Sequence, residues 1–91
     1  MLKPSWKASK FHMLAKIKLY KVPDSIIRAY KIETNTTDAI SKAIFEELQR
    51  FLLLAALSTY RLQPSACIRE AWSYFLIETE KYENYCKQIF G

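Results

Sequence analysis

Glycine is almost absent from this chain: Gly91 is the only one among 91 residues, and it stands at the last position. No internal position therefore offers the left-handed backbone geometry that tight β-hairpins and phosphate-binding loops adopt at little steric cost. This scarcity excludes a Walker loop, a dinucleotide-binding fingerprint and an EF-hand, which all require glycine at a fixed place. It also disfavours a sheet-rich fold, so we expect helices joined by short polar connectors.

Residue types that bind metals or perform catalysis are also scarce. The single histidine, His12, has no second imidazole to join it in a metal site, and Cys67 and Cys86 do not form a C-x-x-C pair. We interpret His12 as a surface or packing residue and Cys86 as a small buried apolar side chain. The glutamates within 46–47 and 78–83 are expected on solvated helix faces, since neighbouring helical positions point in different directions. We therefore expect no enzymatic activity, no catalytic residue, no metal and no cofactor.

Long hydrophobic runs are missing too. The longest, Phe51 to Leu57, is far shorter than the roughly 20 apolar residues of a membrane-spanning helix. The start of the chain lacks the continuous apolar core of a secretory signal. If Cys67 and Cys86 share one helix, they stand roughly 28 Å apart along it, too far for a disulfide within one subunit. We therefore expect no transmembrane segment and a reduced, intracellular location in the cytoplasm.

Positive charge is concentrated at the start of the chain. The net charge is +5, but residues 1–31 carry eight basic side chains against one acidic one, a balance of +7. Residues 32–91 carry six basic and eight acidic side chains, a balance of −2. We divide the chain accordingly into a basic N-terminal arm or helix, residues 1–22, and one helical domain, residues 23–91.

Pro23 is expected to begin the first helix of that domain, with a capping side chain from Asp24 or Ser25, and the helix runs to about residue 32. After a polar connector, Thr36 or Thr37 is expected to cap a second helix, whose first turn suits an acidic residue. Its apolar face is predicted to consist of Ile40, Ile44, Leu48, Phe51, Leu52 and Ala55.

A third helix is predicted from a cap at Ser65 to Phe90. Seven of its residues recur at steps of four and three, and we call them the C-terminal seam: Ile68, Trp72, Phe75, Thr79, Tyr82, Cys86 and Ile89. The short link between the second and third helices makes them antiparallel neighbours. The expected fold is thus all-α, a small bundle of three to four helices with two long antiparallel helices and a basic N-terminal arm.

Residues 11–22 fit two patterns. Apolar and polar side chains alternate from Ala15 to Tyr20, which is typical of a strand, whereas Leu14 and Ile17 fall on one helix face. We favour a helix that begins near Ser9, and an extended arm is the alternative.

The second half of the chain resembles a known family. The pieces that carry the likeness are EELQRFLLLAA at 46–56, the pair Pro64-Ser65, IREAWS at 68–73, and then Thr79, Tyr82 and Cys86. In order and spacing, over about residues 36–90, they resemble the helical module of the glycine-rich domain-containing protein family of bacteria and plants. Where the family pattern has aspartate and histidine, this chain has Arg69 and Ser73. The resemblance implies an inherited helical scaffold and no defined reaction to transfer.

Our first functional hypothesis is a protein-interaction module that acts as an adaptor, an inhibitor or a subunit of a larger assembly. If the C-terminal seam faces the core, Ile77 lies nearly opposite it, with Tyr74 and Tyr85 to one side. Aromatic and large apolar side chains on an outer face are typical anchors for a protein partner. The alternative is that the N-terminal helices cover these three residues.

Our second hypothesis is nucleic-acid binding by the arm. Its basic and aromatic side chains could meet phosphates and stack on bases: Lys3, Trp6, Lys7, Lys10, Lys16, Lys18 and Lys21. The alternatives are a solubilising lysine face, a segment that docks on an acidic protein, or peripheral attachment to a membrane.

Overall fold

The structure is a computed structural model, and it describes residues 16–17, 21–58 and 61–90. Within these ranges four helices follow one another: α2 (Asp24–Thr34), α3 (Asp38–Leu57), α4 (Ala66–Ile77) and α5 (Thr79–Phe90). No strand occurs in the described ranges, and the predicted all-α fold is confirmed. Lys16 and Ile17 are helical, but most of the segment 11–22 lies outside the described residues, so its choice between helix and strand stays a prediction.

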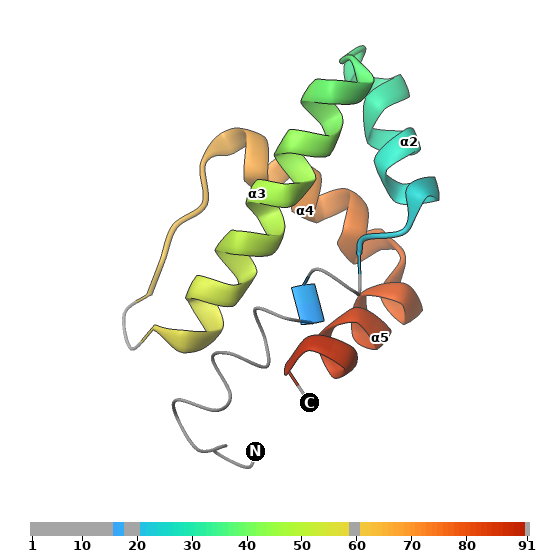
Figure 1. Cartoon of the computed structure of the whole chain (residues 1–91). Helices are drawn as coiled ribbons and strands as arrows, with labels where there is room; N and C mark the ends of the chain where they lie inside the picture. Colours follow the sequence, from blue (N-terminus) through green and yellow to red (C-terminus); the bar gives the residue numbers. More distant parts are fainter. Residues whose placement is uncertain (1–15, 18–20, 59–60, 91) are drawn as a thin grey trace.

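The helix α3 is the centre of the arrangement (Figure 1). It contacts α2 on one side and α4 on another, and α4 also contacts α2 and α5. In Figure 1, α2 lies beside the N-terminal half of α3, α4 crosses behind α3, and α5 follows α4 after a bend. The helix α3 therefore packs on more than one side.

The start of α2 differs from the prediction. Pro23 is the N-cap, and no side chain caps the helix. Instead, the carbonyl of Pro23 accepts hydrogen bonds from the amides of Ile26 at 3.1 Å and Ile27 at 3.4 Å. The helix ends at Thr34, and its C-cap is Asn35, whose left-handed backbone, φ 54° and ψ 43°, takes the place that glycine commonly fills at a helix C-terminus. The chain thus makes a tight helix connection without an internal glycine.

Thr37 caps α3, and its hydroxyl accepts a hydrogen bond from the amide of Ile40 at 3.2 Å. The predicted apolar face of this helix is confirmed in part, because Leu48 and Leu52 are buried and Ile44 and Phe51 pack against the core. Ile40, however, is 50% exposed, whereas Phe45 and Leu53, which lie outside the predicted face, are buried. The side-chain hydroxyls of Thr36 and Ser41 are hydrogen-bonded at 2.7 Å, so the buried position in the first turn belongs to Ser41 and not to its neighbour Ile40.

The predicted helix from Ser65 to Phe90 is broken at Glu78, whose backbone angles, φ −86° and ψ 69°, are not helical. Ser65 caps α4 as expected, accepting a hydrogen bond from the amide of Ile68 at 3.3 Å. Next to the break, the Thr79 hydroxyl donates to the carbonyl of Leu76 at 3.4 Å, a local bond of the kind that competes with helix continuation. The C-terminal seam is therefore not one straight line.

The bend brings aromatic rings from both helices together. Tyr82 and Tyr85 of α5 each meet Phe75 of α4 edge to face, with ring centroids 5.0 and 5.2 Å apart. Phe75 and Ile89 are fully buried, while Tyr82 is half-buried and Thr79 is exposed. A straight helix would carry α5 away from the core, so these ring contacts favour the bent arrangement.

Candidate protein-interaction surface

A groove lies between α2 and the region where α4 meets α5. We call it the Ile77 groove; its volume is about 300 Å³, and its lining comprises Ser25, Ile26, Ala29, Glu33, Tyr74, Ile77, Glu78 and Lys81. Two of the three residues predicted for partner binding, Tyr74 and Ile77, are therefore brought together here. The α2 residues that line the groove were not predicted, because no sequence motif connects them to Tyr74 and Ile77.

Ile77 lies at the last position of α4 and is 74% exposed. Its predicted place on an outer face is confirmed. The buried residues of α4 are Ala71 and Phe75, and two residues beyond Phe75 a helix has turned by about 200°, so Ile77 points away from the core. A large aliphatic side chain is thus held at the surface by helix geometry.

Tyr74 is half-buried, because α2 covers part of its ring. Its ring packs edge to face on Tyr30, with centroids 5.5 Å apart, and its hydroxyl donates a hydrogen bond to the carboxylate of Glu33. That bond, supported by partial desolvation, raises the pKa of Tyr74 to about 12. Tyr74 therefore joins α4 to α2 and forms one wall of the groove.

The prediction that Tyr85 lies on an outer face is wrong. Tyr85 is only 5% exposed, and its phenolic oxygen accepts a hydrogen bond from the side-chain amide of Gln49 at 3.0 Å. The break at Glu78 is the physical reason, since it redirects α5 so that Tyr85 faces Phe75 and α3. Burial raises the pKa of Tyr85, although the Gln49 bond opposes that shift.

Charged side chains border the Ile77 groove. The ammonium of Lys81 donates to the hydroxyl of Ser25 at 3.1 Å and forms an ion pair with Glu78 at 3.3 Å. Glu33 is the second acid of the groove, and its bond partner Tyr74 is uncharged at neutral pH. Two carboxylates against one ammonium leave the groove with an excess negative charge.

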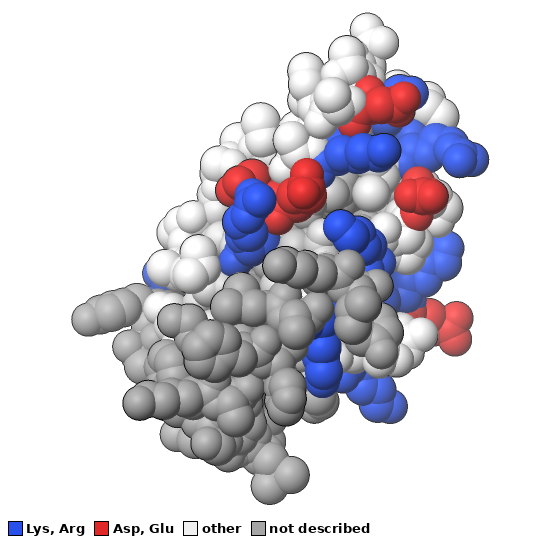
Figure 2. Space-filling view, viewed as in Figure 1, with Lys and Arg blue, Asp and Glu red and all other residues white. Residues whose placement is uncertain are grey.

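Most residues predicted for nucleic-acid binding lie outside the described residues: Lys3, Trp6, Lys7, Lys10 and Lys18. Of the remaining two, Lys21 is exposed and Lys16 is half-buried. On the part of the surface that Figure 2 colours by charge, basic and acidic side chains are interspersed. For example, Lys31 is paired with Asp38 at 2.7 Å, and this pair lowers the pKa of Asp38.

Metal-binding clusters and membrane-spanning helices are both missing from residues 16–17, 21–58 and 61–90. Within them, no group of three or more His, Cys, Asp or Glu side chains is placed to hold a metal ion. No helix in the same ranges is long and apolar enough to cross a membrane. Cys67 and Cys86 carry free thiols, and burial raises the pKa of the half-buried Cys86.

The two positions at which this chain departs from the family pattern both face solvent. Arg69 and Ser73 are exposed on α4, and the hydroxyl of Ser73 donates to the backbone carbonyl of Glu70. Between them, Trp72 packs on Phe51, with ring centroids 5.7 Å apart.

In comparisons with protein-family models, curated proteins and solved structures, no match to the chain was found. The resemblance to the glycine-rich domain-containing family stays a prediction.

Proposed function

We propose that this protein acts without catalysis, as an interaction module that binds a protein partner through the Ile77 groove. The observation that carries the proposal is the 74% exposure of Ile77 beside a groove whose walls are tied together. The Tyr74 bond to Glu33 and the Lys81 bond to Ser25 connect α2 to the helices opposite. The groove is therefore preorganised, and a partner would lose little binding free energy to the ordering of side chains.

The partner in this proposal presents an apolar side chain next to a cation. The apolar side chain would pack on Ile77 and Ala29, and a lysine or arginine would meet the excess negative charge of Glu33 and Glu78. The proposal includes a reduced, cytoplasmic location, which the free thiols of the two cysteines favour.

To test the proposal, the tagged protein is purified from its source organism together with any bound partner. The affinity of the purified partner for this protein is then measured. Ile77→Glu introduces a charge into the groove and is expected to abolish binding. Leu54→Glu is the matched control, because Leu54 is also a large exposed aliphatic residue, 58% exposed, but lies on α3 and does not line the groove. A partner that binds wild type and Ile77→Glu equally would contradict the proposal, provided circular dichroism shows both variants folded.

Nucleic-acid binding by residues 1–22 is the second candidate, favoured by the balance of +7 over residues 1–31. The expected behaviour is an affinity whose logarithm falls linearly with the logarithm of salt concentration. Replacing Lys16, Lys18 and Lys21 by glutamate should abolish that binding. Absence of binding to single- and double-stranded nucleic acid at low salt would eliminate this candidate.

A further inference from the structure

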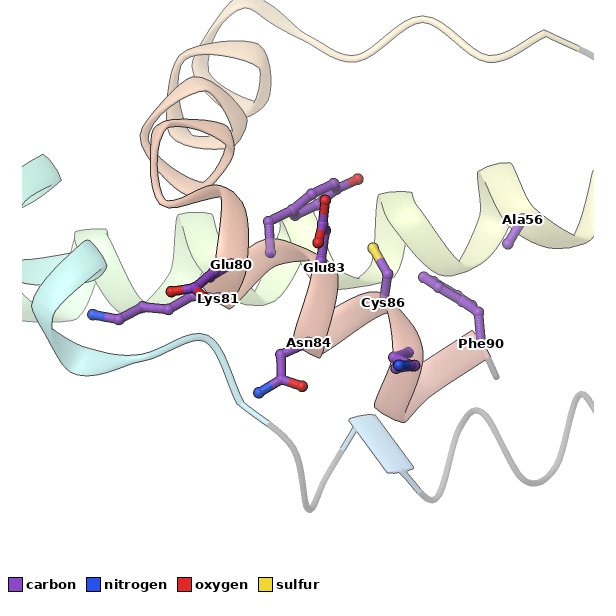
Figure 3. Close-up of a pocket in the computed structure, with 9 residues that line it drawn as sticks. Ala56, Glu80, Lys81, Glu83, Asn84, Cys86 and Phe90 are labelled. Atoms are coloured by element: carbon purple, nitrogen blue, oxygen red, sulfur yellow. The ribbon is translucent and has the colours of Figure 1, made fainter.

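A second, larger groove, of about 970 Å³, lies between α5 and the C-terminal part of α3 (Figure 3). We call it the α5 groove. Its apolar lining comes from Ala56 of α3 and from Tyr82, Cys86 and Phe90, which recur every fourth residue on α5 and share one face. In Figure 3, Cys86 and Phe90 project to the same side of the helix. These three α5 side chains are only half-buried, so the face retains apolar surface that an occupant can cover.

The charges along this face change sign from one end to the other. Glu80 and Glu83 lie toward the start of α5, and Lys87 lies in its last turn. Lys81 also borders the groove, but its ammonium is bonded to Ser25 and Glu78, and Figure 3 shows it directed toward α2. Among the described residues, neither Glu83 nor Lys87 belongs to an ion pair.

We propose that a second copy of this chain occupies the α5 groove, with the two α5 helices packed antiparallel about a twofold axis. A twofold interface uses the same patch on both copies, so the patch must be complementary to itself. A face that is acidic at one end and basic at the other meets this condition only when the helices run in opposite directions. Antiparallel packing also opposes the two helix dipoles favourably.

The register follows from the charges. A twofold axis at the level of Tyr85 lies midway between Glu83 and Lys87. It places Glu83 of each copy opposite Lys87 of the other copy, so two equivalent ion pairs form. The same register puts Phe90 of one copy at the level of Glu80 in the other, about 3 Å along the axis from the level of Tyr82. The aromatic rings at the two ends of the face would then cover each other's exposed edges.

Charge exchange tests both the partner and the direction of packing. Wild type is expected to form dimers in sedimentation equilibrium and light scattering, with a dimer fraction that rises with concentration. Glu83→Lys alone and Lys87→Glu alone each place like charges together twice, and each should weaken self-association by about tenfold or more. An equimolar mixture of these two variants restores opposite charges at both contacts, so the mixture should form heterodimers with near wild-type affinity.

A parallel arrangement would place Glu83 against Glu83 and Lys87 against Lys87 already in wild type. The single variants would then associate no more weakly than wild type, and the mixture would associate more strongly than wild type, so the two directions of packing give different results. Both substitutions lie on exposed positions, and circular dichroism checks that the fold is retained. A wild-type chain that stays monomeric at millimolar concentration would overturn the proposal, as would single variants that dimerise as well as wild type. A mixture that fails to associate more strongly than either variant alone would overturn it too.

Discussion

The side-chain amide of Gln49 on α3 donates a hydrogen bond to the phenolic oxygen of Tyr85 on α5 at 3.0 Å, within the core. Both residues are about 95% buried, and 36 positions separate them in the chain. The bond gives the buried phenolic oxygen of Tyr85 a partner within the core. It also fixes the position of α5 relative to α3, because Tyr85 additionally packs on Phe75.

Tyr85→Phe should therefore destabilise the fold. The substitution keeps the ring but removes the hydroxyl that accepts the hydrogen bond from Gln49, and the expected loss is about 0.5–1.5 kcal/mol in the free energy of unfolding. Urea denaturation followed by circular dichroism measures it. Tyr82→Phe is the control: that hydroxyl is half-buried, and its bond from Trp72 is longer, 3.4 Å. A loss equal to or smaller than that of the control would contradict the role given to the Gln49 bond.

Local signals are sufficient to predict the starts of α3 and α4. The capping preference of hydroxyl side chains predicts Thr36 or Thr37 for the first of these helices and Ser65 for the second. In the structure, Thr37 and Ser65 each accept a hydrogen bond from the amide three residues later. The all-α class followed from the absence of internal glycine. The exposure of Ile77 was predicted from helical spacing within one element, where geometry alone decides which side a residue takes.

Features that depend on packing between helices were not predictable from spacing. The C-terminal seam continues regularly through Glu78, so nothing in its periodicity signals the break. Tyr85 was placed outside because a straight helix puts it there, whereas the bend turns it onto Phe75. In the Ile77 groove, the pair of Glu78 and Lys81 can be recognised from the sequence, because the two residues are three positions apart in the chain. No pattern in the sequence connects Glu33 to Tyr74, which lie on different helices.

Phe75 is expected to be the most sensitive position of α4. Its side chain is fully buried and touches the rings of Tyr82 and Tyr85. Phe75→Ala should lower the free energy of unfolding by about 3–5 kcal/mol, from lost burial and the cavity that remains. Leu76→Ala serves as the neighbouring control, since Leu76 is 46% exposed and should lose much less. Thermal and urea unfolding compare the two variants, and similar losses would contradict the assigned core.

Thr37 is expected to contribute through its side chain to the stability of α3. Thr37→Ala removes the acceptor for the Ile40 amide and should cost about 1 kcal/mol in the free energy of unfolding. Thr37→Ser keeps the hydroxyl and should restore most of that stability. Urea denaturation of the three proteins is the measurement. Equal losses for alanine and serine would show that the hydroxyl is not the stabilising group.

Tyr74 should make stability fall at alkaline pH. Its pKa is about 12 in the folded protein and 10.0 in the unfolded chain, because the Glu33 carboxylate accepts a bond from the protonated phenol. Above pH 10 the unfolded chain loses this proton while the folded protein keeps it, so the unfolded state binds fewer protons. The stability from this bond is fully present below pH 10 and is lost as pH rises to about 12.

Tyr74→Phe and Glu33→Gln isolate this effect from the titration of other groups. Both variants lack the phenol–carboxylate pair, so each should lose less stability than wild type between pH 10 and about 12. In Glu33→Gln, the ultraviolet absorbance of tyrosinate should also show Tyr74 ionising closer to its ordinary pKa, because the neutral amide no longer opposes the negative phenolate. If the free energy of unfolding fell with pH by the same amount in wild type and both variants, the hydrogen bond between Tyr74 and Glu33 would not persist in solution. The assignment of Tyr74 as a fixed wall of the Ile77 groove would then be contradicted.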